Sequence, residues 1–267
     1  MSIDLSDLTH FAEHLAGIAR PMLLAAASKQ AAIETKVDRS FVTATDKAIE
    51  QRLRREIAER YPAHGIIGEE EGRERENASV QWVLDPIDGT APFIAGVPVF
   101  GTLIALAIDD VPVVGVMDFP MTDDRLVGQS GALTLHNGRP CHTRNCPSLD
   151  KAIMATMNPD FFTADETASL DQLRSETAWR IYGTSSFGYG QLARGRIDLA
   201  FDTRLGIYDF AAYRPIIEGA GGVVTDWQGS AITLRSGPQV LAAGAQSLHR
   251  LALDKIASRP TRANFLS

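Results

Sequence analysis

The sequence predicts an α/β protein whose N-terminal half is α+β and whose C-terminal half is α/β. Two segments in which apolar residues recur at helical spacing come first, and several short apolar segments separated by turn residues follow them. Beyond about residue 145, strand-like and helix-like segments alternate, which is typical of α/β units. We therefore expect two subdomains, residues 1–145 and residues 146–267.

The first elements are two amphipathic helices. Apolar residues recur at helical spacing over residues 8–23, and Pro21 predicts that this helix is kinked or restarts there. Apolar residues at every fourth position from Ile49 to Ile57 indicate the second helix. The segment Thr43–Asp46 in front of it is a variant of the capping box, and the helix should end before Pro62.

Short strands follow the helices. We expect strands at Gly65–Gly68 and Trp82–Leu84, joined by a solvated, charged loop at residues 73–77. The apolar segments Val99–Ile108 and Val111–Asp118 flank two aspartates, which predicts a hairpin.

The remaining elements continue this meander and then alternate. Residues 125–129 and 132–135 are strand-like, and an Asn-Gly turn signal lies within His136–Arg139. Periodicity is lost over residues 141–149, which we interpret as the boundary between the halves. Beyond it, the expected strands are Ala152–Thr156, Arg180–Tyr182, Ile197–Phe201, Val223–Asp226 and Val240–Ala243, and the expected helices are Glu166–Ser175, Phe187–Arg194, Asp209–Glu218 and Ser247–Ile256.

Length and charge limit the possible functions. A chain of 267 residues with 45% hydrophobic residues can bury a substantial core. A net charge of −7 and a pI near 5.4 argue against nonspecific nucleic-acid binding, which depends on basic groups that neutralise phosphates. No apolar run is long enough to span a membrane, and the acidic N-terminus lacks a secretory signal pattern, so we expect a cytoplasmic protein.

The segment Trp82–Thr90 carries the strongest functional signal. An apolar strand leads into Asp85, turns at Pro86 and presents Asp88. Two carboxylates this close repel each other unless a cation lies between them, and Mg²⁺ takes oxygen ligands and leaves room for water and a phosphate. Backbone N–H groups at a following helix start suit an anion. On these residues alone, a capped strand–turn–helix is the alternative.

Two further acids lie elsewhere in the chain. Glu69 follows a short strand that ends at Gly68, and Asp209 leads into a helix rich in small residues. Each acid by itself is typical of a solvated loop. Together with Asp85 and Asp88 they supply enough carboxylates for a centre with two cations.

Four segments together resemble the inositol monophosphatase superfamily, whose members are Mg²⁺-dependent, lithium-sensitive phosphatases. These segments are Thr43–Asp46, Gly68–Glu70, Asp85–Thr90 and Tyr208–Gly222, and they occur in the family's order at compatible spacings. The resemblance implies a layered α-β-α-β-α sandwich, a homodimer and two or three Mg²⁺ ions in each active site.

The resemblance also implies a role for each acid. Glu69, Asp85 and the carbonyl of Ile87 hold one cation. Asp85, Asp88 and Asp209 hold the other, so that Asp85 bridges the two. A carbonyl ligand is chemically sensible at Ile87 because the preceding proline restricts the turn.

Further residues match the family's water-activating and phosphate-binding positions. Thr90 and Asp46 match the pair that activates the attacking water, although Asp46 also has a structural interpretation as a helix N-terminal acid that complements the macrodipole. The backbone N–H groups of Gly89 and Thr90 are expected to bind phosphate oxygens, because glycine permits close approach. Glu70 or Glu71 would hold water around a weak third cation.

Two strings are more similar to the histidinol-phosphate phosphatase branch than to the inositol branch. They are Phe100–Leu106 and Tyr208–Phe210, and the alternative is that they reflect ancestry and core packing. Asp202 lies near the position where the family places an acid against the non-phosphate end of the substrate, and Asp209 also counts among the substrate contacts. An ammonium group would favour Asp202 through a charge-assisted hydrogen bond, whereas an ion pair with Arg204 would weaken that preference.

We therefore expect Mg²⁺-dependent hydrolysis of a small phosphorylated metabolite, with histidinol phosphate, from histidine synthesis, as the first expectation. Inositol 1-phosphate or a related sugar phosphate is the alternative, followed by the 3′-phosphate of a nucleotide bisphosphate. A regulatory or scaffolding protein that retains the fold without turnover is the alternative from a different class. Loss of a metal ligand would indicate it, yet every predicted ligand is present.

Overall fold

The computed structural model describes residues 4–28, 33–35 and 41–257. The helices are α1 (Leu5–Ala27), α2 (Ala44–Arg60), α3 (Thr90–Ala95), α4 (Ala164–Glu176), α5 (Phe187–Ala193), α6 (Ile207–Phe210), α7 (Tyr213–Gly219) and α8 (Gln246–Ala257), with 3-10 turns η1 (Leu149–Lys151) and η2 (Pro159–Phe161). The strands are β1 (Ile33–Thr35), β2 (Phe41–Thr43), β3 (Gly65–Gly68), β4 (Gly72–Glu74), β5 (Val80–Asp88), β6 (Gly101–Ile108), β7 (Val111–Phe119), β8 (Asp124–Gln129), β9 (Leu135–His136), β10 (Arg139–Pro140), β11 (Ile153–Thr156), β12 (Trp179–Tyr182), β13 (Leu199–Asp202), β14 (Val223–Thr225) and β15 (Val240–Ala243).

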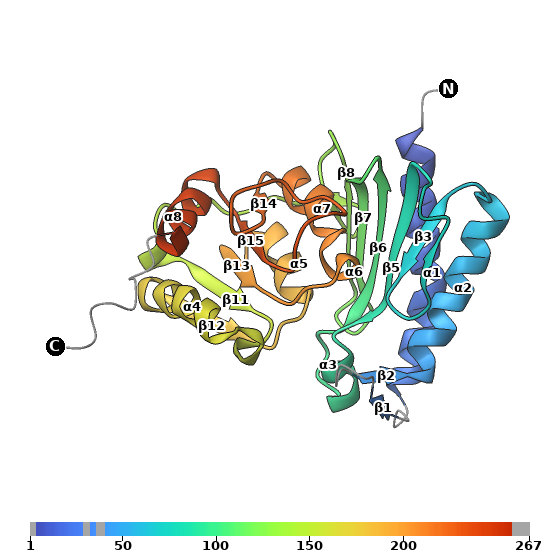
Figure 1. Ribbon diagram of the computed structural model, residues 1–267, viewed down its shortest axis with the longest axis horizontal. Coiled ribbons are helices and arrows are strands. Elements are labelled where there is room, and N and C mark those ends of the chain that lie inside the picture. Colours follow the sequence, from blue (N-terminus) through green and yellow to red (C-terminus); the bar gives the residue numbers. More distant parts are fainter. Residues whose placement is uncertain (1–3, 29–32, 36–40, 258–267) are drawn as a thin grey trace.

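These elements form five layers, which confirms the predicted α-β-α-β-α sandwich (Figure 1). The helices α1 and α2 pack on the outer face of an eight-stranded sheet, in the order β10-β9-β8-β7-β6-β5-β3-β4. The helices α5, α6 and α7 lie between this sheet and a five-stranded sheet, in the order β12-β11-β13-β15-β14. The helices α4 and α8 cover the outer face of the second sheet.

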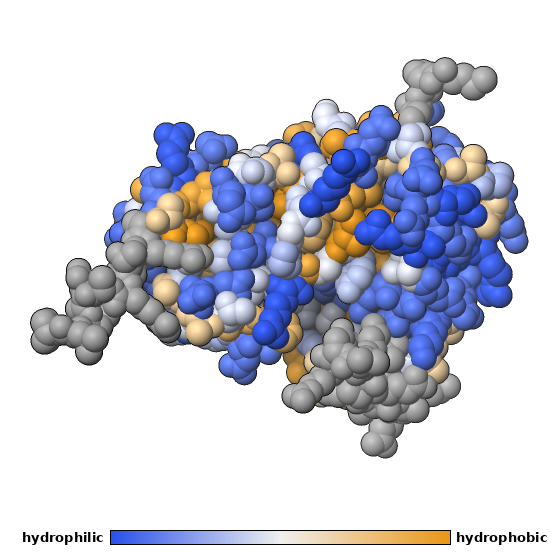
Figure 2. All heavy atoms as spheres, in the orientation of Figure 1, coloured by the Kyte–Doolittle hydropathy of each residue, from blue (hydrophilic) through white to orange (hydrophobic). Residues whose placement is uncertain are grey.

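Both faces of the central strands are buried, which explains their continuous apolar strings. In β5, Trp82 and Leu84 belong to the core under α1 and α2, whereas Val83 belongs to the core between the sheets. The outward side of α2 is hydrophilic (Figure 2), as expected for an amphipathic helix on an outer layer.

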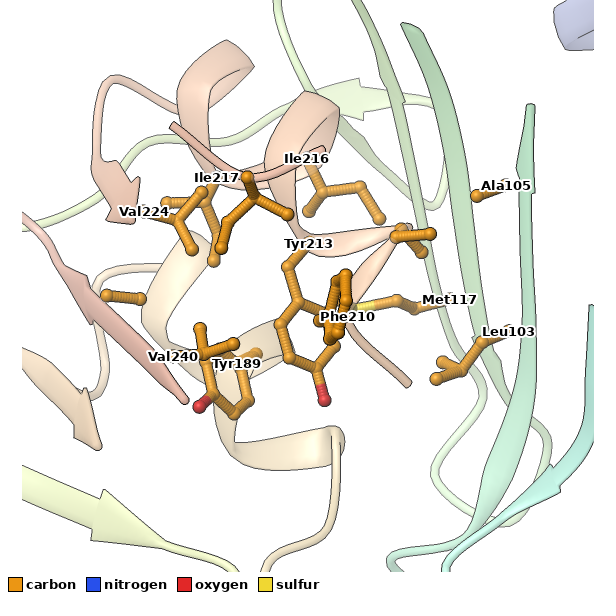
Figure 3. Packing of buried hydrophobic residues seen from close by; sticks show 14 of the residues in the cluster. Leu103, Ala105, Met117, Tyr189, Phe210, Tyr213, Ile216, Ile217, Val224 and Val240 are labelled. Atoms are coloured by element: carbon orange, nitrogen blue, oxygen red, sulfur yellow. The ribbon is translucent and has the colours of Figure 1, made fainter. Parts of the chain in front are cut away.

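The core between the sheets takes residues from both halves of the chain. Leu103 and Met117 of the first sheet face Phe210 and Tyr213 of the middle layer (Figure 3). Because the two halves share this core, the division into subdomains at residues 1–145 and 146–267 stays a prediction.

The first helix differs from the expectation. It continues without a restart from Leu5 to Ala27, with Pro21 inside it. Pro21 removes one hydrogen bond, to the carbonyl of Gly17, and both residues lie on the exposed side of α1, where water can replace the lost partner.

Two expected strand boundaries and one helix also change. β5 extends to Asp88 and is longer than the predicted Trp82–Leu84, and part of the predicted loop forms the exposed strand β4, paired antiparallel with β3. The single helix predicted over Asp209–Glu218 is two helices, α6 and α7. Pro215 explains this break, because it has no N–H to donate to the carbonyl of Ala211.

Within the described residues, no helix is both long enough and apolar enough to cross a membrane.

Candidate metal centre

Two acids meet at the carboxyl ends of neighbouring parallel strands. β3 pairs in parallel with β5, with Gly68 opposite Leu84, so that the next residues along each strand are Glu69 and Asp85. The Glu69 N–H donates to the Leu84 carbonyl at 3.2 Å and fixes the backbone at this point. Side chains that follow parallel strands lie at one edge of the sheet, which is where α/β proteins commonly bind ligands.

An irregularity in β5 brings Asp88 to the same end of these strands. The pairing of β5 with β6 shifts register between Asp85 and Asp88, and Pro86 lies within this shift. Proline has no N–H for the ladder and therefore fits where the ladder is interrupted. The Thr102 hydroxyl donates to the Pro86 carbonyl at 2.8 Å and holds the irregular segment.

The third acid comes from the middle layer. Asp209 lies in α6, which packs against β5 and β6, and its Oδ2 accepts the Gly206 N–H at 2.6 Å. One carboxylate oxygen from each of Asp85, Asp88 and Asp209 lies within 4.8 Å of the other two. The structure thus brings together three acids that the sequence places up to 124 residues apart.

The cluster has the electrostatics of a cation site. Burial, and then the charges of Glu69, Asp88, Asp209 and Asp46, raises the pKa of Asp85 well above its usual value. Burial raises the pKa of Asp88 to about 7, although hydrogen bonds from a neighbouring serine act against the shift. Burial and the charge of Asp88 raise the pKa of Asp209 in the same way. A cation between these carboxylates would favour their ionised forms.

The donor set fits a hard divalent cation. The Asp85 Oδ1 atom is buried and has no hydrogen-bond partner among the described residues, although a buried carboxylate oxygen normally has one. Carboxylate oxygens are the ligands that Mg²⁺ prefers in proteins. Asp85, Asp88 and Asp209 would therefore hold such an ion, and Glu69 would complete the set from the next strand.

The predicted water-activating and phosphate-binding residues lie at the end of β5 and in the first turn of α2. Thr90 begins α3, and its hydroxyl donates to the Ile87 carbonyl at 3.2 Å. Gly89, with φ +78°, precedes it in the left-handed region that favours glycine, and a Cβ there would meet Ser185 Oγ at 2.7 Å. The helix α3 contacts β2, which leads directly into the first turn of α2 that carries Asp46 (Figure 1).

Asp46 also has the structural role expected of an acid at a helix N-terminus. Its Oδ2 accepts the Thr43 N–H at 2.8 Å and the Thr43 hydroxyl at 2.6 Å, which forms the predicted capping box. Its charge reaches the metal cluster as well, because it contributes to the raised pKa of Asp85. The two interpretations of Asp46 are therefore compatible.

Asp202 is buried, and its charge contributes to the raised pKa of Asp209. Its Oδ1 accepts the Met157 N–H at 2.7 Å, its Oδ2 accepts the Tyr189 hydroxyl at 3.0 Å, and only 2% of the residue is exposed. Burial raises the pKa of Asp202 to about 8. Arg204 is exposed and forms no ion pair with Asp202, whose oxygens both have other partners. A contact between Asp202 and substrate stays a prediction.

Glu50 supports the turn after β3, and the sequence does not indicate this contact. It is fully buried in α2, and its carboxylate accepts the N–H groups of Glu70 and Glu71 at 2.8 and 3.0 Å and an N–H of Arg54 at 2.8 Å. These bonds fix the turn that carries Glu69. Glu50 belongs to the polar side of an amphipathic pattern, so no local signal separates it from a solvated acid.

Comparison with known proteins agrees with this geometry. Residues 4–260 match the model of the inositol monophosphatase family. The chain belongs to this family. It is 39% identical over 233 residues to the bifunctional phosphatase IMPL2 of Arabidopsis thaliana, which covers 84% of the chain and 67% of that protein. It is 32% identical to a histidinol-phosphatase of Mycobacterium tuberculosis over 206 residues, 74% of the chain and 79% of that protein.

A solved structure gives the same result at the level of the fold. An inositol monophosphatase from Zymomonas mobilis superposes with a TM-score of 0.87 at 36% identity, covering 96% of the chain and all of that protein. The chain is therefore a phosphatase of the inositol monophosphatase family, which is metal-dependent. The predicted superfamily is confirmed.

Proposed function

We propose that the protein is a Mg²⁺-dependent phosphatase that hydrolyses histidinol phosphate to histidinol. The observation that carries the proposed chemistry is the buried cluster of Asp85, Asp88 and Asp209, with one carboxylate oxygen that lacks a hydrogen-bond partner among the described residues. Support for the substrate comes from the histidinol-phosphatase relative and from the strings Phe100–Leu106 and Tyr208–Phe210.

The metal-binding residues follow from this proposal. Glu69, Asp85, the Ile87 carbonyl, Asp88 and Asp209 would hold two Mg²⁺ ions, with a weaker third ion near Glu70 or Glu71. When bound, the ions supply neutralisation of the phosphoryl oxygens and a lower pKa for an attacking water.

The chain's own residues orient the reactants. The hydroxyl of Thr90 can rotate from the Ile87 carbonyl to accept a hydrogen bond from the attacking water and pass its own proton towards Asp46. The backbone N–H groups of Gly89 and Thr90 bind phosphate oxygens. A cationic end of the substrate would favour the ionised form of Asp202, which would act on it by its charge and through Tyr189.

Steady-state phosphate release tests this function. Histidinol phosphate and inositol 1-phosphate are compared with Mg²⁺ present, with EDTA as the control. We expect kcat/KM to favour histidinol phosphate by about a hundredfold or more, roughly 3 kcal/mol of differential transition-state binding. The reverse preference would assign the protein to inositol or sugar phosphates. Lack of release from either ester would favour a regulatory protein without turnover.

The Asp202→Asn variant tests the substrate's charged end. We expect it to raise KM for histidinol phosphate and to leave KM for inositol 1-phosphate nearly unchanged, because only the first ester carries an ammonium group. An equal loss for both esters would show that Asp202 stabilises the pocket and does not select the substrate.

We also propose a homodimer. The edge strand β12 exposes 67% of Trp179, 39% of Ile181 and 43% of Tyr182, and apolar side chains on an open sheet edge favour pairing with another surface. Light scattering after size-exclusion chromatography should give the mass of two chains, and Trp179→Lys should shift it towards one. A monomeric protein would contradict this proposal.

A further inference from the structure

One residue outside the metal cluster holds both oxygens of Asp88. Ser186, directly before α5, donates its N–H to Asp88 Oδ2 at 2.9 Å and its hydroxyl to Asp88 Oδ1 at 2.8 Å. Ser186 is fully buried. Two hydrogen bonds to two different oxygens fix the plane of the carboxylate as well as its position.

A tyrosine completes the contacts of this serine. The Tyr213 hydroxyl lies 2.6 Å from Ser186 Oγ, and Tyr213 is fully buried at the start of α7. A serine hydroxyl has one hydrogen, and an ionised carboxylate has none, so Ser186 must use its hydrogen on Asp88. The bond between Tyr213 and Ser186 is therefore donated by Tyr213.

A second tyrosine fixes the first. The rings of Tyr213 and Tyr189 stack with their centroids 4.0 Å apart and their planes at 19°. Figure 3 shows both hydroxyl oxygens pointing to the same side, away from Ile216 and Ile217. Because Tyr189 is itself bonded to a buried acid and almost fully buried, the stack leaves the Tyr213 hydroxyl little freedom to move from Ser186.

We propose that Ser186 and Tyr213 are positioning residues of the metal centre, and that Tyr213 acts on Asp88 through Ser186. The inference rests on the proposed function, in which Asp88 is a metal ligand. Hydrogen bonds to metal-ligating carboxylates orient them, and removal of such partners commonly costs about ten- to a hundredfold in metal affinity. The ring of Tyr213 packs in the core, and its hydroxyl orients Ser186, which in turn orients Asp88.

Calorimetric titration of the full chain with Mg²⁺ tests the proposal without a substrate. Ser186→Ala retains the backbone N–H bond and removes the hydroxyl, and we expect the Kd for Mg²⁺ to rise about tenfold. Tyr213→Phe retains the stacked ring, and its Kd should rise by a smaller factor. The double variant should match Ser186→Ala, because the hydrogen bonds of the described residues link Tyr213 to Asp88 through Ser186.

Ser169→Ala is the matched control. Ser169 is a fully buried serine in α4, in an outer layer, and its hydroxyl has no hydrogen-bond partner among the described residues. The same chemical change there should leave the Kd unaltered. Melting temperatures without metal identify any variant that fails to fold. If Ser186→Ala does not fold, the Kd of Tyr213→Phe tests the proposal.

The outcomes separate this inference from the proposed function. An unchanged Kd in both Ser186→Ala and Tyr213→Phe, with an Asp88→Asn variant that loses Mg²⁺ binding, would overturn the positioning role. Additive effects in the double variant would overturn the route from Tyr213 through Ser186. Equal Mg²⁺ binding by the wild type and Asp88→Asn would instead contradict the metal assignment itself.

Discussion

Asp88 and Asp202 are both buried carboxylates, and their surroundings give them different tasks. Asp88 accepts its hydrogen bonds from one serine and has two other acids within 4.8 Å, so a cation would favour its ionised form. Asp202 accepts bonds from a backbone N–H and from Tyr189, which satisfy it within the protein. Residue type alone does not separate these cases, but the hydrogen-bond partners do.

Asp209→Asn should abolish most of the activity. We expect kcat to fall at least about a thousandfold, equivalent to about 4 kcal/mol, because the change removes an anionic metal ligand. Asn can still accept the Gly206 N–H, so the melting temperature of the metal-free variant should stay near the wild-type value. Asp165→Asn, an exposed acid in α4, is the control and should have normal kinetics. Near-normal activity of Asp209→Asn would refute the ligand assignment.

Thr90→Ala should slow the chemical step more than it weakens metal binding. The hydroxyl of Thr90 bonds to the Ile87 carbonyl and would orient the attacking water, whereas the cations are held by carboxylates. We expect kcat to fall by about a hundredfold while the Mg²⁺ concentration for half-maximal activity changes little. A variant that recovers wild-type rates at high Mg²⁺ would show that Thr90 acts on the metal instead.

At the scale of elements, close approach between α7 and the first sheet places the middle layer. Gly115 of β7 pairs in register with Gly128 of β8, and the two form a flat area on the sheet. A Cβ on Gly115 would meet the Ala212 carbonyl oxygen at 2.5 Å, and a Cβ on Gly128 would meet the Ile216 nitrogen at 2.5 Å. The preceding helix, α6, carries Asp209, so this packing helps to set the position of that carboxylate.

Gly115→Ala should therefore destabilise the protein and reduce its activity. We expect the free energy of unfolding to fall by about 1–3 kcal/mol, because the backbone at Ala212 must shift away from the sheet. Gly237→Ala, where a Cβ would meet no atom within 4 Å, should change it by less than about 0.5 kcal/mol. Denaturant unfolding compares the two, and equal effects would contradict the close-packing argument.

In the whole molecule, the site lies where the carboxyl ends of β3 and β5 in the first sheet meet the helices of the middle layer. Glu69, Asp85 and Asp88 come from the first sheet, whereas Asp209 and Ser186 come from the middle layer. Assembly of the site thus requires both sheets and the middle layer. The buried acids make the stability of the folded protein depend on pH and on metal.

Without metal, stability should fall as the pH rises. The pKa of Asp88 is raised to about 7 and that of Asp202 to about 8 in the folded protein, above the ordinary value of 3.8. Their contribution to stability is fully present below about pH 4 and is lost as the pH rises through those folded values. We expect the melting temperature in EDTA to decrease between about pH 5.5 and 8.5.

Added Mg²⁺ should reduce that decrease, because it binds the ionised carboxylates of the folded protein alone. Differential scanning calorimetry with EDTA and with Mg²⁺ measures both curves. Asp202→Asn should make this slope shallower in EDTA, because the carboxyl group of residue 202 no longer titrates. A melting temperature in EDTA that rises over this range would contradict the burial argument.

Features that depend on neighbouring residues could be predicted from the sequence. Helical periodicity, strand alternation, the capping box at Thr43 and the acids of the Asp85–Thr90 segment all follow from local spacing. The local rule for proline failed at Pro21, where solvent exposure let the helix continue. The break before Pro215 follows from its missing N–H, which the single helix expected over Asp209–Glu218 did not take into account. The family resemblance supplied the order of the layers, which the periodicity did not.

Which distant groups meet depends on the packing of the strands and helices. Parallel pairing of β3 with β5 places Glu69 beside Asp85, and packing of α6 on β5 adds Asp209. Ser186 reaches Asp88 across 98 residues, and Glu50 reaches the turn after β3 across 20. The physical reason is that a hydrogen bond or a charge interaction acts through space, so its partner leaves no mark on the spacing of nearby residues.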